Sequence, residues 1–274
     1  MKINFIYNMV DFIQKNNGTA IEMSDNSTEW CLKGVLHRNN GPAIEASQGR
    51  KSWYFNGKLH NTNGPARISL FSKKWCFNGK LHRENGPAIE NLFGSNEWYI
   101  NGKLHRENGP AIEKNGDKEW YINGVRHRID GPAIENINGN KEWWINGVRH
   151  RTDGPAIENI NNKEWWINGV RHRTDGPAVE NINGNKKWYI NGELHRTDGP
   201  AIENINGNKE WYINGVRHRL DGPAIKNING IKGNNEWYIY GTKHSENGTM
   251  IIDGPILWWC CCYYRQKSSL DYDD

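Results

Sequence analysis

A strict internal repeat covers almost the whole 274-residue chain and limits the folds open to it. The triplet Gly-Pro-Ala returns every 22 or 23 residues, starting at Gly41, Gly64, Gly86, Gly109, Gly131, Gly154, Gly176, Gly199 and Gly222. A tryptophan returns in step, at Trp30, Trp53, Trp75, Trp98, Trp120, Trp143, Trp165, Trp188, Trp211 and Trp237. A period of this length predicts a row of small supersecondary units, none of which can bury its apolar face alone.

The length variation is confined to one half of the repeat. Each Trp precedes the next Gly of the triplet, or its degenerate copy at Gly248, by 11 residues. The interval from that Gly to the following Trp is 11, 12 or 15 residues. The fixed interval predicts a structural unit with a strict register, and the variable interval predicts a surface loop whose length is unconstrained.

The repeat that starts at Glu119 shows the expected local structure. Asn123-Gly124 lies between two β-prone runs and is the strongest short signal for a β-hairpin, because a type I′ turn needs positive φ at both central residues. The following Asp130-Gly131-Pro132 predicts a bend, because Asp favours an Asx-turn and Pro cannot donate to a ladder. No segment has a 3.6-residue period long enough for a helix.

A two-residue turn fixes the pairing of the two strands that it joins. Ile122 should face Val125, and Tyr121 should face Arg126. In the same register Trp120 should face His127. Since side chains alternate along a strand, Trp120, Ile122, Val125 and His127 are predicted to share one face, while Tyr121 and Arg126 share the other. Tyr–Arg packing on that second face adds an expected cation–π contact.

The predicted fold is all-β: an elongated, solenoid-like meander of about ten antiparallel β-hairpin repeats of 22–23 residues. Residues 1–29 are expected to form an N-terminal cap and half-repeat, residues 30–252 the repeat array, and residues 253–274 an apolar, Cys-rich C-terminal tail. The ends depart from the repeat, as end caps do, because Thr19 and Thr249 replace the proline.

The period and the Asn-Gly-x-x-His spacing with an upstream Trp resemble MORN repeats, over residues 16 to about 255. This chain departs from the usual unit, in which Gly follows His, because Arg128 follows His127 here. The form His-Arg-x-Asp-Gly-Pro-Ala is similar to a variant in repeat proteins of large DNA viruses and phages. The resemblance implies an elongated β-hairpin array that serves as an interaction scaffold, sometimes with membrane or self-association roles.

All the histidines occupy one repeat position, seven residues after each tryptophan. Equivalent residues of successive hairpins are about 9–10 Å apart by strand spacing, whereas a zinc–nitrogen bond is about 2 Å long. One ion therefore cannot bridge neighbouring histidines, and no metal or other cofactor is expected. We expect each His to pack beside Trp and to bond a carbonyl or an acid of the next repeat.

The charged residues also recur with the period. Arg follows His in most repeats, and Glu follows Pro-Ala-Ile or Pro-Ala-Val, as in Arg128 and Glu135. The simpler hypothesis is a set of cross-strand ion pairs between repeats, each worth about 0–1 kcal/mol. The functional alternative is a charged stripe that docks a partner.

Periodicity also argues against an enzyme, because an active site is singular and its groups have different surroundings. The chain has no nucleophile–base pair outside the repeat and no phosphate-binding Gly loop that opens a helix. A formal charge of +4 with interspersed signs does not predict nucleic-acid binding.

The C-terminal tail is the one non-periodic chemical feature. Trp258, Trp259, Cys260, Cys261 and Cys262 are followed by Arg265 and Lys267, a pattern that suits membrane-surface contact or S-acylation. The alternatives are an apolar cap over the last hairpin and a self-association segment. The earlier Cys31 and Cys76 each follow a Trp, where they are expected to substitute for a packing aromatic residue.

These observations favour a non-catalytic repeat scaffold for protein–protein interaction or structural assembly, and the resemblance points to a viral protein. A protein partner or self-association is expected, and a cytoplasmic location, in the host cytoplasm or in a virion, follows from the absence of a signal peptide pattern and of a disulfide framework. Two other functions stay open: a peripheral membrane module held by the tail, and a repeat protein that binds a glycan or another small ligand through exposed Trp and Tyr. The structural repeat signature comprises Trp120, Asn123, Gly124, His127, Arg128, Asp130, Gly131 and Pro132.

Overall fold

The computed structural model describes residues 14–15, 18–23, 26–228 and 235–246. The chain forms two compact units, residues 1–138 (unit 1) and 139–274 (unit 2). Each unit is an elongated all-β array of antiparallel β-hairpin repeats, which confirms the predicted fold class. The predicted boundaries of a cap at 1–29 and a tail at 253–274 stay predictions.

Unit 1 contains a main sheet, which is an antiparallel meander. Its strands pair in the order β1 (Gln14–Lys15), β2 (Gly18–Glu22), β3 (Thr28–Leu32), β5 (Ile44–Ala46), β6 (Arg50–Ser52), β9 (Arg67–Ile68), β10 (Ser72–Lys74), β13 (Ile89–Asn91), β14 (Asn96–Glu97), β17 (Ile112–Lys114), β18 (Asp117–Glu119) and β21 (Ile134–Glu135). A short 3₁₀ turn, η1 (Ser47–Gly49), joins β5 to β6.

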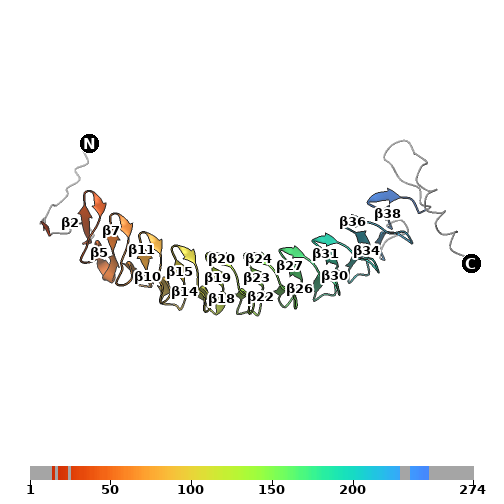
Figure 1. Ribbon diagram of the computed structural model, residues 1–274, viewed down its shortest axis with the longest axis horizontal. Coiled ribbons are helices and arrows are strands. Elements are labelled where there is room, and N and C mark those ends of the chain that lie inside the picture. The colour runs from red at the N-terminus through yellow and green to blue at the C-terminus, as the bar shows by residue number, and fades with distance from the viewer. Residues whose placement is uncertain (1–13, 16–17, 24–25, 229–234, 247–274) are drawn as a thin grey trace, which may run out of the picture. The chain divides into compact units, whose positions relative to one another are not determined.

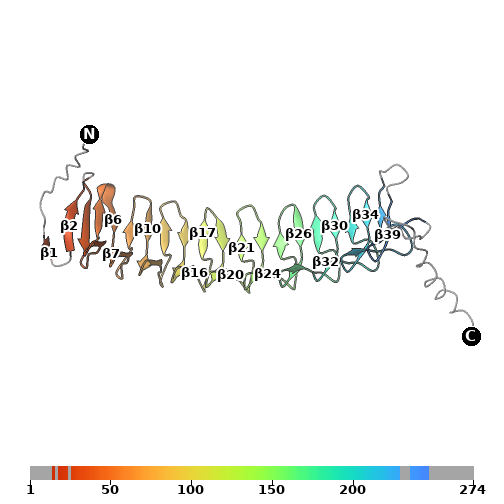
Figure 2. The ribbon, with the colours of Figure 1, turned by 90° about the horizontal axis from the view of Figure 1, so that it is seen from above.

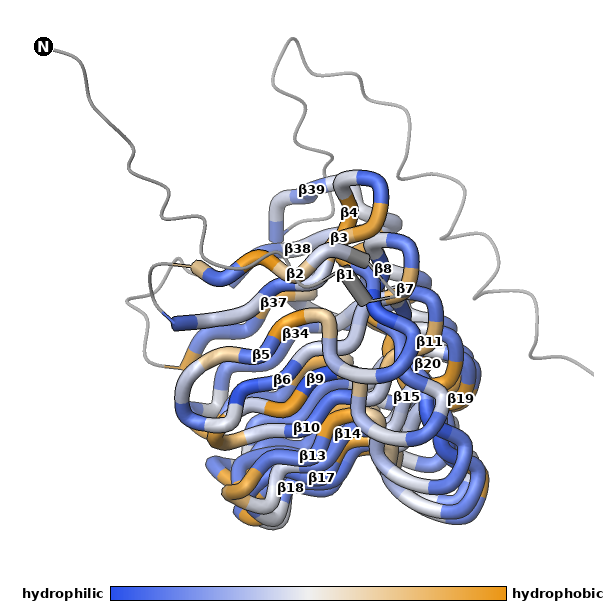
Figure 3. Tube along the Cα trace, turned by 90° about the vertical axis from the view of Figure 1, so that its left-hand side faces the viewer, coloured by the Kyte–Doolittle hydropathy of each residue, from blue (hydrophilic) through white to orange (hydrophobic). Residues whose placement is uncertain are grey.

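A row of short hairpins lies along one side of this sheet (Figures 1 and 3). The hairpins of unit 1 pair β3 with β4 (Val35–Leu36), β7 (Tyr54–Phe55) with β8 (Lys58–Leu59), β11 (Cys76–Phe77) with β12 (Lys80–Leu81), β15 (Tyr99–Ile100) with β16 (Lys103–Leu104), and β19 (Tyr121–Ile122) with β20 (Val125–Arg126). Each repeat thus contributes two strands to the sheet and two to the hairpin row.

Unit 2 repeats the same two rows (Figure 2). Its sheet strands pair in the order β22 (Lys141–Glu142), β25 (Ile157–Glu158), β26 (Asn162–Glu164), β29 (Val179–Asn181), β30 (Lys186–Lys187), β33 (Ile202–Glu203), β34 (Lys209–Glu210) and β37 (Ile225–Lys226). Its hairpins are β23–β24 (Trp144–Ile145, Val148–Arg149), β27–β28 (Trp166–Ile167, Val170–Arg171), β31–β32 (Tyr189–Ile190, Glu193–Leu194), β35–β36 (Tyr212–Ile213, Val216–Arg217) and β38–β39 (Trp237–Ile239, Thr242–His244).

The hairpin turn and its register match the prediction. Asn123 has φ 52° and Gly124 has φ 84°, so both central residues adopt the positive φ that an Asn-Gly turn supplies at low cost. Tyr121 pairs with Arg126 and Ile122 with Val125. The same turn recurs where Lys33 or Tyr240 replaces the asparagine, each with positive φ.

The tryptophan marks the point where the chain passes from sheet to hairpin. Its backbone bonds in both directions: Trp120 N donates to Ala133 O at 2.8 Å, and His127 N donates to Trp120 O at 3.2 Å. The intervening Asp130-Gly131-Pro132 forms a bend rather than a strand, as predicted. Every repeat therefore closes on itself through its own Trp and Ala.

The core is thin and is built around alanine. The Ala of every Gly-Pro-Ala triplet is 0% exposed, whereas no large side chain among the described residues is fully buried. The tryptophans are half-buried. Because a small residue fills the tightest site, the two rows approach closely at the triplet.

The variable interval forms a surface loop at the far end of the sheet strands, as predicted. Most of these loops expose one or two large apolar side chains, among them Leu92, Ile137 and Ile182, each at 73% exposure. Among the described residues no helix is long and apolar enough to cross a bilayer.

Candidate functional site

In most repeats an arginine follows the histidine and organises the bend that leads to the Gly-Pro-Ala triplet. This bend, residues 128–132 in the repeat of Trp120, is called the corner below. The Arg128 guanidinium lies over the Trp120 ring, with Cζ 4.0 Å from the ring centroid. Arg128 Nη1 donates to the Pro132 carbonyl at 3.1 Å and to Glu135 Oε1 at 2.9 Å, and Nε donates to Asp130 Oδ1 at 3.0 Å. The hydrogen bond from Arg128 holds the pKa of Asp130 below its usual value, so this exposed carboxyl stays ionised.

This arginine also explains the glycine of the triplet. A Cβ on Gly131 would lie 2.8 Å from Arg128 Cζ, so an alanine there would push the guanidinium off its ring. The repeat with Asn61 in place of arginine provides the internal comparison. A Cβ on Gly64 would meet only Asn61 Nδ2, at 3.7 Å, and Asn61 Nδ2 still donates to the Pro65 carbonyl at 3.0 Å.

The predicted ion pairs between repeats are wrong for these residues, because Arg128–Glu135 and Arg128–Asp130 join residues of one repeat. The corner brings the arginine back over its own tryptophan, and its guanidinium then reaches the strand that follows the triplet. The same pairing within a repeat occurs at Arg106–Glu113, at 3.0 Å.

A second polar cluster was only half predicted. The Tyr121–Arg126 contact exists, with Cζ 5.6 Å from the ring centroid. The missed member is Glu119, whose Oε2 accepts from Tyr121 OH at 2.8 Å and from Arg126 Nη2 at 3.1 Å. Burial, together with the hydrogen bond to Glu119, raises the pKa of Tyr121. In unit 2 the equivalent Glu164 is 8% exposed, and its carboxylate accepts from Asn162, Trp166 and Arg171.

Within each unit the histidine of one repeat caps the hairpin turn of the next repeat, whereas Nδ1 of His244, in the last described hairpin, is buried without a partner. His105 Nδ1 accepts from Asn123 N at 3.1 Å, and His172 Nδ1 accepts from Asn191 N at 3.1 Å. The location in the next repeat matches the prediction, but the partner does not, because it is a backbone N–H rather than a carbonyl or an acid. In several repeats Oδ1 of the turn asparagine also lies beside the histidine Nδ1. The distance from His195 Nδ1 to Asn214 Oδ1 is 2.8 Å.

The histidine cap should make the array sensitive to acid at His218. Its Nδ1 accepts from Tyr240 N at 3.1 Å, and burial lowers the pKa of His218 from 6.5. The unfolded chain therefore takes up the proton first, so this contribution to stability is complete above about pH 6.5 and is lost as the pH falls through the lower folded-state pKa.

We expect the pH dependence of the unfolding free energy between pH 7.5 and 5 to be shallower in His218→Gln than in the parent protein. The glutamine oxygen accepts the same N–H without titrating. Urea unfolding at both pH values measures the slope, and an unchanged slope in the variant would contradict the assignment.

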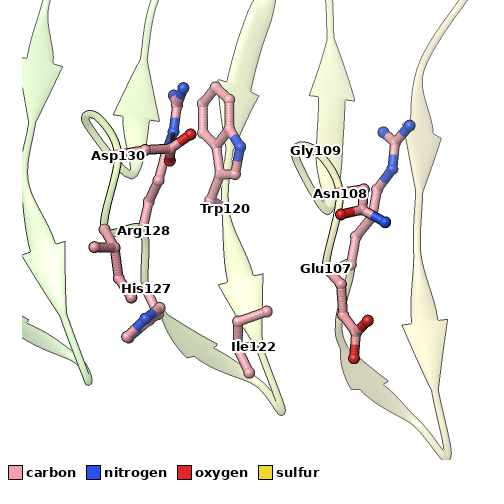
Figure 4. Close-up of a pocket in the computed structure, with 10 residues that line it drawn as sticks. Glu107, Asn108, Gly109, Trp120, Ile122, His127, Arg128 and Asp130 are labelled. Atoms are coloured by element: carbon pink, nitrogen blue, oxygen red, sulfur yellow. Dashed lines mark hydrogen bonds and ion pairs between the residues drawn. The ribbon is translucent and has the colours of Figure 1, made fainter.

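Hollows lie between the corners of neighbouring repeats, and Figure 4 shows the residues that line one of them. One hollow, of about 540 Å³, is lined by Glu107, Asn108 and Gly109 from one repeat and by Trp120, Ile122, His127, Arg128 and Asp130 from the next. The tryptophan, isoleucine and histidine come from the hairpin strands and their ends, while the acidic and amide side chains come from the corner loops.

Equivalent hollows occur in both units. In unit 1 the preceding hollow, of about 520 Å³, has Trp98, Ile100 and His105 in the same places. In unit 2 a hollow of about 540 Å³ has Trp165, Ile167 and His172. The acidic side chains at the rim vary, being Glu84 and Glu107 in the preceding hollow of unit 1 and Asp153 and Asp175 in unit 2. The site is therefore a repeated groove rather than a single pocket.

The hollow combines most of the predicted signature. Trp120, His127, Arg128 and Asp130 line it, and Gly131 and Pro132 form the corner next to it, whereas Asn123 and Gly124 form the turn at the far end of the hairpin. The sequence pattern identified these residues but not the cavity, because the cavity exists only between two stacked repeats.

The remaining predicted features divide by location. Cys76 in β11 is 4% exposed and Cys31 is half-buried, and burial raises the pKa of both thiols. Trp258, Trp259, Cys260, Cys261 and Cys262 lie outside the described residues. Within the part of the chain that the structure describes, no three His, Cys, Asp or Glu side chains gather as a metal site would require.

No protein-family model matches the chain, and a search of the curated proteins finds no match either. The resemblance to MORN repeats therefore stays a prediction.

Proposed function

We propose that the chain is a non-catalytic scaffold that binds a partner protein along the row of hollows. The observation that supports this proposal is the recurrence of one lining, Trp, Ile and His with a rim carboxylate, in both units. Identical shallow sites in a row suit weak contacts that add up along an extended partner, whereas an enzyme needs one site with distinct groups.

The polar character of the hollows also suits an exposed interaction surface. Asp130 and Asp153 are 83% and 78% exposed, and each accepts from the Nε of the arginine beside it, which also stacks on Trp and donates to the Pro carbonyl. The guanidinium groups therefore bind within their own repeats, and the carboxylates that they hold keep a large exposed surface for a partner. Rim charges of this kind set the association rate and the choice of partner more than the raw affinity.

The proposal is tested by charge reversal at the rim. We expect Glu107→Lys, which alters two adjacent hollows, to reduce capture of the partner at least tenfold when the tagged chain is purified from its native cells and cross-linked. Mass spectrometry should place the cross-links on the hollow-lining repeats of the parent protein.

Glu193→Lys is the matched control. Glu193 is exposed in β32, outside the hollows, and three other repeats carry Lys58, Lys80 or Lys103 at the same position. Equal loss of the partner in both variants, or no loss in Glu107→Lys, would exclude the hollows as the binding surface. Cross-links only between copies of the chain would indicate structural assembly instead.

A further inference from the structure

The spacing of the hollows constrains the shape of a ligand that fills several of them. Each repeat adds two strands to the sheet, and strands lie about 4.7–4.9 Å apart, so equivalent points recur roughly every 9.4–9.8 Å. A polyproline II helix has three residues per turn and a rise of about 3.1 Å, which gives about 9.3 Å per turn. The two periods differ by only about 0.1–0.5 Å per repeat.

The histidine that lines the hollow of about 520 Å³ offers a hydrogen-bond donor. Because His105 Nδ1 accepts the Asn123 N–H at 3.1 Å, the neutral ring carries its proton on Nε2. His105 lies in the lining of that hollow, beside Trp98 and Ile100. A polyproline II chain has no internal hydrogen bonds, so its carbonyl groups are available to such donors.

The other groups of the hollow suit the side chains of such a segment. Trp120 and Ile122 provide an apolar surface, and aromatic-lined grooves are a common surface for proline-rich segments. From Glu84 onward each corner also presents an exposed carboxylate, such as Glu84 or Asp175, at 78% and 79% exposure, whereas the first two repeats carry Asn40 and Asn63 instead. One basic side chain per turn would meet one carboxylate per repeat.

We propose that the row of hollows binds a proline-rich segment in the polyproline II conformation, one turn per repeat, with a basic residue at every third position. This inference rests on the proposed scaffold function and specifies its partner. A flat glycan is less well matched, because Arg128 already covers one face of the Trp120 ring at 4.0 Å and neutral sugars bring no cation to the exposed rim carboxylates.

The test uses the full chain and synthetic peptides. We expect acetyl-(Pro-Pro-Lys)₄-amide to bind at least about tenfold more tightly than acetyl-(Pro-Pro-Lys)₂-amide, because each added turn engages another hollow. A peptide of the same composition with all its lysines at one end keeps the charge but loses the register, and we expect about tenfold weaker binding. Fluorescence anisotropy at physiological salt measures all three, and Glu107→Lys should weaken only the periodic peptide.

Three outcomes would overturn the inference: no binding of the periodic peptide, equal binding of the clustered peptide, or displacement of the peptide by a neutral β-linked oligosaccharide. The scaffold function can fail separately. If the peptide does not bind but Glu107→Lys still abolishes partner capture while Glu193→Lys does not, the hollows bind a protein of another shape. If Glu107→Lys leaves capture unchanged, the proposed function itself is wrong.

Discussion

Replacing Arg173 by alanine is expected to lower the free energy of unfolding by about 2–4 kcal/mol. Arg173 stacks on Trp165 at 3.9 Å and donates to the Pro177 carbonyl at 3.1 Å and to Glu180 at 2.8 Å. Its side chain is only 19% exposed, so the loss combines a cation–π contact with charge-assisted hydrogen bonds that are partly shielded from water. Urea unfolding followed by tryptophan fluorescence measures the change.

The Asn61 repeat supplies the matched variant. Asn61 keeps the hydrogen bond to the proline carbonyl without any guanidinium stack. Arg173→Asn should therefore lose less stability than Arg173→Ala, while Lys163→Ala, at an exposed position of β26, should change it by less than about 0.5 kcal/mol. If the alanine variants at positions 173 and 163 were equally stable, the arginine would not organise the corner.

Replacing Ala178 by leucine is expected to destabilise the protein by about 3 kcal/mol or more, which is enough to open that repeat. Ala178 is 0% exposed, and its carbonyl accepts from Trp165 N at 2.9 Å, so a larger side chain forces apart the sheet and the hairpin row where they join. The same urea titration, with hydrogen exchange to locate the opened repeat, measures the effect.

Val179→Ile is the control for added volume. Val179 is 7% exposed, and the equivalent positions carry Ile134, Ile157 and Ile202, so the extra methyl group already fits in neighbouring repeats. We expect a change of less than about 1 kcal/mol. Similar losses in Ala178→Leu and Val179→Ile would show that the alanine site is no tighter than its neighbour.

The sequence predicted the parts of the fold that depend on neighbours along the chain. The Asn123-Gly124 turn fixes the pairing of Tyr121 with Arg126 because a two-residue loop allows one register. The loop at 136–140 followed from the variable interval, because only a surface segment tolerates length changes. Strand alternation likewise explains why Tyr121 and Arg126 lie on one face.

The sequence could not predict contacts that depend on the angle of the corner or on the stacking of repeats. The partner of Arg128 is Glu135 of its own repeat, because the bend at Asp130 turns the chain back over Trp120. His105 Nδ1 accepts from a backbone N–H. Because almost every residue type carries this group, the sequence does not show which residue will donate it. The hollows arise from the gap between two corners, so no single repeat contains them.

The contact between one histidine and the turn of the next repeat has a consequence for the number of repeats in the array. In unit 2 the histidines at 150, 172 and 195 each accept from the turn N–H of the next repeat, so these repeats form the same junction. Removing residues 143–164 would join Glu142 to Trp165 and restore the Glu-Trp pair found in most repeats. Loss or gain of a whole repeat would thus keep the same contact between neighbours, and the array can be shortened or lengthened by whole units without a new one.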